Sequence, residues 1–266
     1  MPKKLIQENL IKISKNHYLN TNNFNMRNCD HQMFWPVFDT GIYEIPDTNI
    51  TKNFELPFII IPNHFSNEDC NKFIDFYNCY KKENELSNAL VGTNNVSDTS
   101  IRNAKNVFIE NELEEFYYSK FEPIREIIEQ CYKTQLINKP VLLYLGYEKD
   151  GHYIAHNDSC QNFPDGTFKY DYSDRKFTVL SILSNQIDAE EELNNYDTHI
   201  GGSLEFTRIV SVVNDKEETI KYKLKKGDVL IFPSTPFFEH KVHKVIDGIR
   251  ATMVQWWDAE ILKKEK

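Results

Sequence analysis

The pattern of apolar and polar residues changes character at about residue 140. Before that point, residues 112–133 place apolar side chains three and four positions apart, which predicts an amphipathic helix in which Pro123 marks a kink or a new start. Residues 67–84 show the same spacing, and Ser66 stands where an N-cap is expected, directly before an acidic first turn. The first half of the chain is therefore expected to contribute two helices.

After these helices the chain is rich in short β-type runs separated by Gly, Pro, Asp and Asn. Two strands are predicted earlier, at 56–62 and 103–109, and the later candidates read VLLYLGY, GHYIAHND, KFTVLSILS, GSLEFTRIV, TIKYKL, DVLIFPS, HKVHKVI and RATMVQWW. Many short strands with turn residues between them are typical of a barrel or a jelly roll. The sequence predicts an α+β fold with a double-stranded β-helix (jelly roll) core of about eight strands and N-terminal bracing helices.

The domain organisation follows from the same pattern. Residues 1–55 are polar, Asn-rich and weakly periodic, so we expect an N-terminal extension that packs on one main domain, 56–266, with its jelly-roll core at about 140–258. The segments 160–176 and 185–200 are expected to be long loops. Such loops are either lids and substrate-binding elements or solvated insertions.

Composition narrows the class of protein. The chain has 266 residues, of which 40% are hydrophobic, enough for a sizeable core. A net charge of −9 disfavours nucleic acid and anionic membranes as partners. Five cysteines without a CxxC pair favour reduced thiols, and the absence of a signal-peptide-like or 18-residue apolar run points to a cytoplasmic protein. The sequence leaves the oligomeric state open.

A candidate metal site lies in the second predicted strand of the β-rich part. His156 and Asp158 are two residues apart, so on a strand both side chains point to one face and can bind one metal ion. A further histidine from another strand would complete a 2-His-1-carboxylate triad, which suits Fe(II) and leaves coordination positions open. His240 and His243 are both candidates, and His152 could face the same way as the first pair. Alone, a His-x-Asp pair also fits a surface histidine bonded to a neighbouring carboxylate.

The order of the motifs is more specific than any one of them. The segments YEKDGHYIAHND, RKFTVLSIL, GGSLEF, GDVLIFPS and HKVHKVIDGIR follow one another within 142–257. This succession resembles the prolyl 4-hydroxylase-like branch of the 2-oxoglutarate/Fe(II)-dependent dioxygenase superfamily. In that family the last metal ligand stands ten residues before an arginine, which selects His240 rather than His243 as the partner of Arg250.

The resemblance implies roles for six residues. His156, Asp158 and His240 would bind Fe(II) and form the catalytic centre. The co-substrate, 2-oxoglutarate, would be bound by three further residues: Arg250, Thr252 and Tyr147. The guanidinium of Arg250 suits the distal carboxylate because its planar fork can donate two parallel hydrogen bonds.

The resemblance also implies the reaction. An enzyme of this kind hydroxylates an unactivated C–H bond with O2 as second co-substrate and releases succinate and CO2; ascorbate is a further candidate cofactor. The branch suggests a prolyl or other amino-acid side chain as substrate, in a peptide or as the free amino acid. Asp158 favours hydroxylation, since related halogenases carry a small residue there. The alternatives are an oxygenase acting on a small metabolite or lipid, and a non-catalytic jelly-roll binding module.

The chain departs from the family pattern at one place. Where the family commonly has a tyrosine near the end of the third strand, this chain has Ser181 and Ile182. His199, which precedes the GG turn, is expected to be a loop residue. Trp256 and Trp257 are expected to pack the end of the last strand, with one of them lining the pocket as the alternative.

Overall fold

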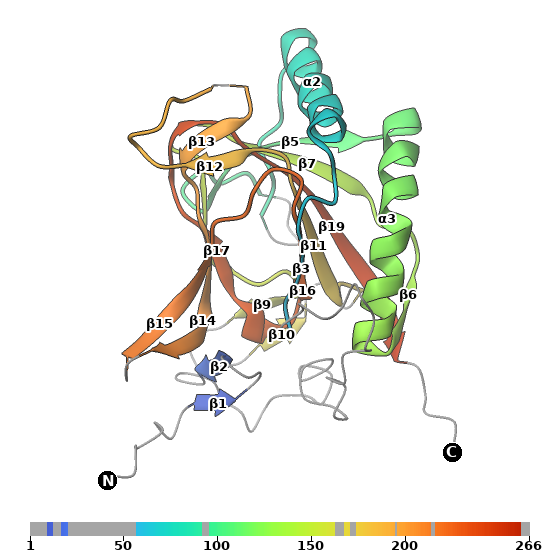
Figure 1. The fold of residues 1–266 in the computed structure, drawn as a ribbon, viewed down its shortest axis with the longest axis vertical. Helices are drawn as coiled ribbons and strands as arrows, with labels where there is room; N and C mark the ends of the chain where they lie inside the picture. Colours follow the sequence, from blue (N-terminus) through green and yellow to red (C-terminus); the bar gives the residue numbers. More distant parts are fainter. Residues whose placement is uncertain are drawn as a thin grey trace.

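Two β-sheets lie face to face, and two helices cover the outer side of one of them (Figure 1). The computed structural model describes residues 10–12, 17–20, 57–91, 96–162, 168–170, 174–194, 196–213 and 216–261. The sheet next to the helices, called here the helix-backed sheet, consists of β3 (Ile59–Ile61), β5 (Lys105–Ile109), β6 (Thr134–Ile137), β7 (Leu142–Tyr147), β11 (Phe177–Ile182), β16 (Val229–Pro233) and β19 (Arg250–Ile261). Its order is β3-β16-β11-β19-β7-β5, and β6 pairs with the end of β19.

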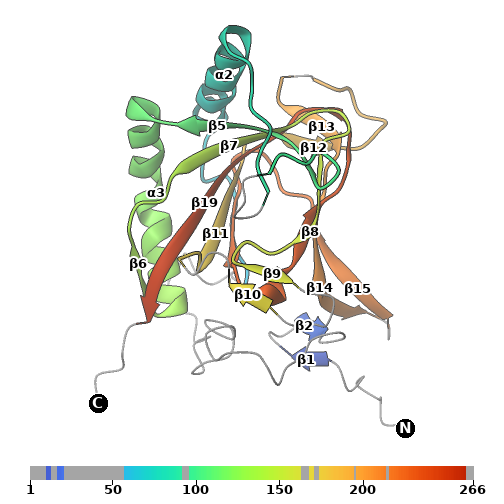
Figure 2. The same ribbon diagram turned by 180° about the vertical axis from the view of Figure 1, so that it is seen from behind.

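The facing sheet, called the opposite sheet, has the order β1-β2-β14-β17-β8-β4, with β15 beside β14. Its strands are β1 (Leu10–Lys12), β2 (His17–Asn20), β4 (Arg102–Asn103), β8 (His152–His156), β14 (Leu204–Val213), β15 (Lys216–Tyr222) and β17 (His240–Val242). The chain crosses from one sheet to the other at each step from β7 to β8, β11, β14, β16, β17 and β19, which is a jelly-roll path (Figure 2).

Shorter elements complete the fold. They are the hairpin of β9 (Cys160–Asn162) and β10 (Phe168–Tyr170), a small sheet of β12 (Asn185–Ile187), β13 (Thr198–Gly201) and β18 (Val245–Gly248), the 3-10 helix η3 (Pro236–Phe238), and the helices α2 (Asn67–Glu83) and α3 (Asn111–Tyr132). Neither α2 nor α3, the α-helices in the described part of the chain, has the length and apolar character of a membrane span.

The helices begin and pack as their sequences dictate. Ser66 caps α2 with a reciprocal pair of bonds: its hydroxyl accepts from the Asp69 amide and its own amide donates to the Asp69 carboxylate, both at 3.1 Å. The helix α3 runs without interruption through Pro123, so the alternative of a new helix start at this residue is wrong. Its buried stripe includes Tyr117 and Phe121, which lie against the helix-backed sheet.

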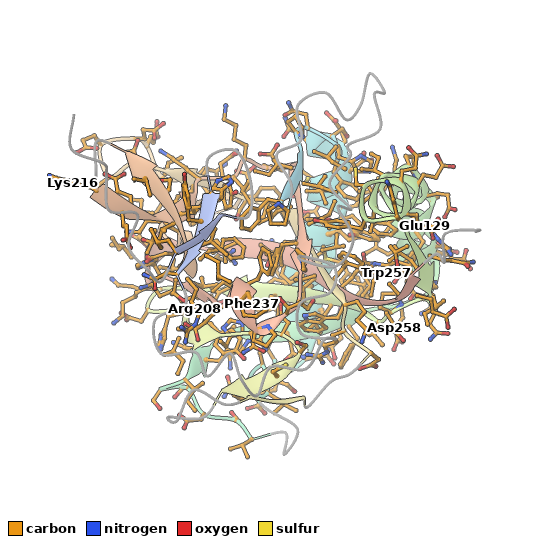
Figure 3. The ribbon with its side chains drawn as sticks, turned by 90° about the horizontal axis from the view of Figure 1, so that it is seen from below. Glu129, Arg208, Lys216, Phe237, Trp257 and Asp258 are labelled. Atoms are coloured by element: carbon orange, nitrogen blue, oxygen red, sulfur yellow. The ribbon has the colours of Figure 1, made fainter. Side chains whose placement is uncertain are left out.

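The alternation of side chains along β19 separates two cores. Met253 and Trp257 belong to the core between the helix-backed sheet and the helices, where the ring of Trp257 stacks on that of Phe121 at 5.0 Å. Val254 and Trp256 face the core between the two sheets, in which Phe237 is fully buried. Figure 3 shows Trp257 beside α3 and Phe237 in the interior between the sheets. The period of two in a strand thus gives each core its own set of residues.

Several predicted boundaries differ from those observed. The run HKVHKVI is two strands rather than one, because β17 pairs within the opposite sheet whereas β18 pairs with β13. The two predicted loops carry short strands of their own, β9 and β10 in 160–176 and β12 and β13 in 185–200. Of the N-terminal extension, β2 pairs with β14 and Leu19 is fully buried, while most of residues 1–55 lie outside the described residues.

Candidate active site

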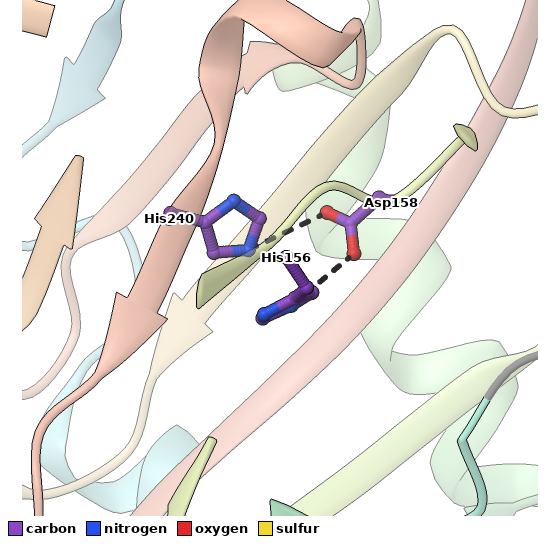
Figure 4. Close-up of side chains that lie close together, drawn as sticks. All are labelled: His156, Asp158 and His240. Carbon is purple, nitrogen blue, oxygen red and sulfur yellow. Dashed lines mark ion pairs between the residues drawn. The ribbon is translucent and has the colours of Figure 1, made fainter. Parts of the chain in front are cut away.

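Three predicted site residues meet where β8 ends and β17 begins. His156 is the last residue of β8 and lies directly opposite His240, the first residue of β17; Asp158 follows two positions after His156. The Nε2 atoms of His156 and His240 lie 3.8 and 3.7 Å from the two carboxylate oxygens of Asp158 (Figure 4). One ligand atom from each residue lies within 4.8 Å of the others. Two imidazoles and one carboxylate in this arrangement can bind a single metal ion from one side.

Both imidazoles are oriented by main-chain carbonyls. Nδ1 of His156 lies 2.8 Å from the carbonyl oxygen of Ile154, and Nδ1 of His240 lies 2.9 Å from that of Phe238. Since only a protonated Nδ1 can donate to a carbonyl, each Nε2 keeps its lone pair for a metal.

Asp158 is oriented by a hydroxyl from the facing sheet. Thr178, on β11, donates to Oδ2 of Asp158 at 2.6 Å, and its hydroxyl also contacts that of Ser234 at 2.7 Å. All three side chains are buried. The carboxylate therefore has a fixed orientation that does not depend on the two histidines.

The protonation states also suit a metal. Burial, followed by the neighbouring His240, lowers the pKa of His156 to about 3. Burial alone would raise the pKa of Asp158, but the two histidines and the hydrogen bond from Thr178 hold it below its ordinary value. The site thus has a neutral imidazole at His156 and an ionised carboxylate at neutral pH, the forms in which these groups bind metals.

Arg250 and Thr252 lie on the inner face of β19, next to the metal ligands. Together with His156, Asp158 and His240 they line one narrow inner pocket of about 30 Å³. Arg250 is 6% exposed, and within the described residues no carboxylate pairs with it. The Thr252 hydroxyl is buried and likewise has no hydrogen-bond partner in the part of the chain that the structure describes. A buried cation without an anion favours a ligand that carries one.

Tyr147 supports Arg250 from the neighbouring strand. It lies opposite Arg250 in the β7–β19 pair, and its ring centroid is 5.2 Å from Cζ of the guanidinium. The residue is buried and also lines the inner pocket. A cation over an aromatic face is attracted to it without being neutralised.

A larger cleft opens beside the metal ligands. It has a volume of about 890 Å³, and His156 and Asp158 lie in its lining. The guanidinium of Arg102 lies over the ring of Tyr153 at 4.7 Å. Three residues that line the cleft each have a buried polar atom without a hydrogen-bond partner in the described ranges: Nε of Arg102, Oδ1 of Asn106 and Nε1 of Trp256. A concave site with a few convergent polar groups is typical of substrate binding.

His243 and His152, the two other candidates for the second histidine ligand, bond to groups outside the metal-ligand set. Nε2 of His243 donates to the Glu205 carboxylate at 2.5 Å, and His152 contacts the carbonyl oxygens of Asp150 and Ser100. Neither belongs to the metal-ligand group found among the described residues. The spacing to Arg250 therefore singles out the histidine that the fold places beside the His-x-Asp pair.

One expectation about a neighbouring residue was wrong. His199 is not a loop residue: it lies on β13 and is 3% exposed. At the departure from the family pattern, the Ser181 hydroxyl lies on the helix side of its strand and contacts that of Tyr117 at 2.8 Å. Trp256 lines both pockets, which is the alternative considered for the tryptophan pair, while Trp257 packs against α3.

Sequence reasoning missed three residues of the site. Thr178 is the last residue of the segment RKFT, and its place in this family motif could have indicated a role beside Asp158. Arg102 lies on β4, which has only two residues and shows no periodicity. His199 reaches Arg250 only through the pairing of distant strands, so nothing local in the sequence indicated it.

This combination defines a class of protein: a jelly roll in which a His-Asp-His group that can bind a metal ion shares one pocket with a buried arginine. Residues 142–258 match the family model of the 2OG-Fe(II) oxygenase superfamily. A PKHD-type hydroxylase from Prochlorococcus marinus (strain AS9601) is 26% identical over 139 residues, which cover 52% of this chain and 56% of that protein. The chain thus spans about half the length of the curated relative it matches.

Solved structures agree on the fold. A prolyl hydroxylase from Trichoplax adhaerens, in complex with a hypoxia inducible factor peptide fragment, has a TM-score of 0.58 at 18% identity, covering 76% of this chain and 83% of that one. A Pseudomonas putida prolyl-4-hydroxylase has a TM-score of 0.53 at 15% identity, covering 76% and 91%. Residues 142–258 are thus similar to the 2OG-Fe(II) oxygenase superfamily, whose members use Fe(II), 2-oxoglutarate and O2, and the fold of the chain is prolyl hydroxylase-like.

Proposed function

We propose that this protein is a dioxygenase that hydroxylates an unactivated C–H bond of a prolyl or other amino-acid side chain, peptide-bound or free, with succinate and CO2 as co-products. One observation carries the proposal: the His156–Asp158–His240 group and the unpaired Arg250 line the same inner pocket. A non-catalytic binding module would have no use for a buried guanidinium beside three metal ligands.

The residues present fit both the metal and the co-substrate. His156, Asp158 and His240 would bind Fe(II), and when bound the metal supplies the redox chemistry that couples decarboxylation of 2-oxoglutarate to C–H oxidation. Arg250 and Thr252 would bind the distal carboxylate, each with a donor that lacks a protein partner in the described residues. The free volume of about 30 Å³ holds little more than one water, so lining side chains must move when 2-oxoglutarate enters.

The large cleft supports an amino-acid substrate. Arg102, Asn106 and Trp256 line the cleft, and each has a buried polar atom without a hydrogen-bond partner in the described residues. If these side chains turn towards the cleft, two N–H donors and one oxygen acceptor can bind the carbonyl and N–H groups of a peptide or an amino acid. The rim of the cleft carries exposed apolar side chains: Leu90, Val96, Phe108 and Val141. A volume of about 890 Å³ exceeds what a single amino acid fills, which favours a peptide.

We infer the following domain organisation. Residues 1–55 form an N-terminal extension that packs on the body, and residues 56–266 form the dioxygenase domain with its core at about 140–258. The core is an eight-stranded double-stranded β-helix in which the small sheet of β12, β13 and β18 belongs to the roll, and α2 and α3 brace the helix-backed sheet. The pairing of β2 with β14 and the burial of Leu19 support the packing of the extension.

The proposal is tested by turnover and by binding. Succinate formation from 2-oxoglutarate should require Fe(II) and should rise when a suitable proline-containing peptide is added. Parallel reactions with free amino acids and with a lipid or metabolite panel separate the substrate classes. Failure of the Mn(II)-loaded protein to bind 2-oxoglutarate in calorimetry would exclude the dioxygenase assignment whatever the substrate.

A further inference from the structure

A buried histidine that the metal site does not use lies beside the proposed co-substrate anchor. His199 is on β13 and lies opposite Gly248 on β18, two residues before Arg250. It is 3% exposed, and Arg250 is 6% exposed. Two buried basic side chains next to each other are unfavourable if both are charged, so one of them must be neutral.

The position of the His199 ring is fixed by Ser184. The Ala251 amide donates to the hydroxyl oxygen of Ser184 at 2.8 Å, and Oγ of Ser184 lies 3.1 Å from Nδ1 of His199. A serine hydroxyl can both donate and accept, so this contact holds the imidazole in place in either neutral tautomer.

His199 and Arg250 approach each other across Gly202. A β-carbon at Gly202 would lie 3.0 Å from Cδ of Arg250 and 3.2 Å from Cδ2 of His199, so a larger residue there would require these side chains to shift. The φ angle of Gly202 is +70°, a conformation that glycine adopts readily. Arg250 thus has the ring of Tyr147 near its guanidinium and the backbone of Gly202, next to His199, near its Cδ.

The residues that surround Arg250 here, Tyr147, Gly202 and His199, are all uncharged, so none of them neutralises the guanidinium. We propose that His199, fixed by Ser184, is a positioning residue that holds the guanidinium of Arg250 towards the inner pocket while leaving its charge free for the distal carboxylate of 2-oxoglutarate. The inference rests on the proposed function, in which Arg250 binds that carboxylate. An acidic residue at position 199 would instead pair with Arg250 and compete with the co-substrate.

The ionisation of His199 is consistent with this role. Burial, followed by the positive charge of Arg250, lowers the pKa of His199 to about 3. The imidazole is therefore neutral at neutral pH, and it does not compete with Arg250 for positive charge.

The test measures 2-oxoglutarate binding to the full-length Mn(II)-loaded chain by calorimetry. His199→Glu should weaken binding about tenfold or more, because the new carboxylate occupies Arg250. His199→Gln, which remains neutral and polar, should weaken it about threefold or less. In turnover, His199→Gln should raise the KM for 2-oxoglutarate and leave kcat at saturating co-substrate unchanged.

A second ligand separates positioning from general damage. Binding of 2-oxopentanoate, which keeps the keto acid but lacks the distal carboxylate, should be equal in wild type and His199→Glu. Equal losses for both ligands would overturn the positioning role. If His199→Glu does not fold, Ser184→Ala decides instead: a higher KM for 2-oxoglutarate at unchanged kcat supports the role, and an unchanged KM overturns it.

Arg250→Leu distinguishes failure of this inference from failure of the proposed function. If Arg250→Leu binds 2-oxoglutarate like wild type, the anchor itself is misassigned. If Arg250→Leu loses binding while His199→Glu binds normally, the anchor stands and only the positioning role of His199 is wrong.

Discussion

The two faces of β19 differ in what they contact. On the outer face, Oε1 of Gln255 accepts from Tyr117 at 3.4 Å and from Nε1 of Trp257 at 3.2 Å within a tightly stacked aromatic layer, while its Nε2 has no partner among the described residues. On the inner face, Thr252 and Trp256 line the inner pocket beside the metal ligands. One strand therefore serves stability on one side and ligand binding on the other, and mutations should separate the two.

The largest effect is expected at the metal ligands. His156→Ala, Asp158→Ala and His240→Ala should each abolish turnover and lower metal affinity by roughly 100-fold or more, because removal of a ligand exceeds the loss of a supporting hydrogen bond. Mn(II) titration measures the affinity directly. His243→Ala is the matched control and should retain most activity, since that side chain bonds to Glu205. An inactive His243→Ala with an active His240→Ala would reverse the assignment.

The adjacent tryptophans give the sharpest comparison of the two faces. Trp257→Ala should lower the free energy of unfolding by about 3–5 kcal/mol, because it empties a packed site against Phe121. Trp256→Ala should destabilise less and instead impair substrate turnover, because this ring lines the cleft. Urea denaturation and steady-state kinetics on both variants check the pair. Equal losses of stability would remove the distinction between the faces.

The pH dependence of stability tests whether the buried imidazole of His199 is neutral in the folded protein. In the folded state the pKa of His199 is about 3, below its ordinary value near 6.5, so the unfolded chain binds the proton first as the pH falls. Stability should therefore decrease as the pH drops from about 6.5 towards 3. Between about pH 7 and pH 5, wild type should lose about 2 kcal/mol more than His199→Gln in denaturant titrations. Parallel curves would show that the pKa of His199 is the same in the folded and the unfolded chain.

The smallest effect is expected at Thr178. Thr178→Val keeps the shape of the side chain but removes the 2.6 Å bond to Asp158, and metal affinity should fall about tenfold. Thr178→Ser restores the hydroxyl and should recover most of the affinity. If the valine variant binds Mn(II) like wild type, the orientation of Asp158 does not depend on this bond.

What the sequence predicts well is what depends on neighbouring residues. The capping of α2 by Ser66, the helical stripe of α3 and the jelly roll itself all follow from short-range patterns, and the structure confirms them. The convergence of His156 and Asp158 is likewise local, since two residues on a strand share a face. The choice of His240 over His243 needed the family spacing, because both lie in the same run.

What the sequence does not predict depends on strand pairing at long range. The contact of Thr178 with Asp158 joins two sheets, and the approach of His199 to Arg250 needs β13 to pair with β18. Local periodicity also does not predict the residue at which the run HKVHKVI passes from one sheet to another. Such features follow from tertiary packing, which a single sequence records only indirectly.

The switch of sheets between β17 and β19 has one more consequence. His240 belongs to the opposite sheet and Arg250 to the helix-backed sheet, so the distance between the two side chains is set by the spacing of two packed layers, about 10 Å in proteins generally. In the proposed function, a co-substrate bound between them would have its length selected by the spacing of the sheets rather than by the connecting segment 243–249. Selection of a five-carbon over a four-carbon keto-diacid would then be a property of the two sheets, and lengthening that segment should leave the preferred chain length unchanged.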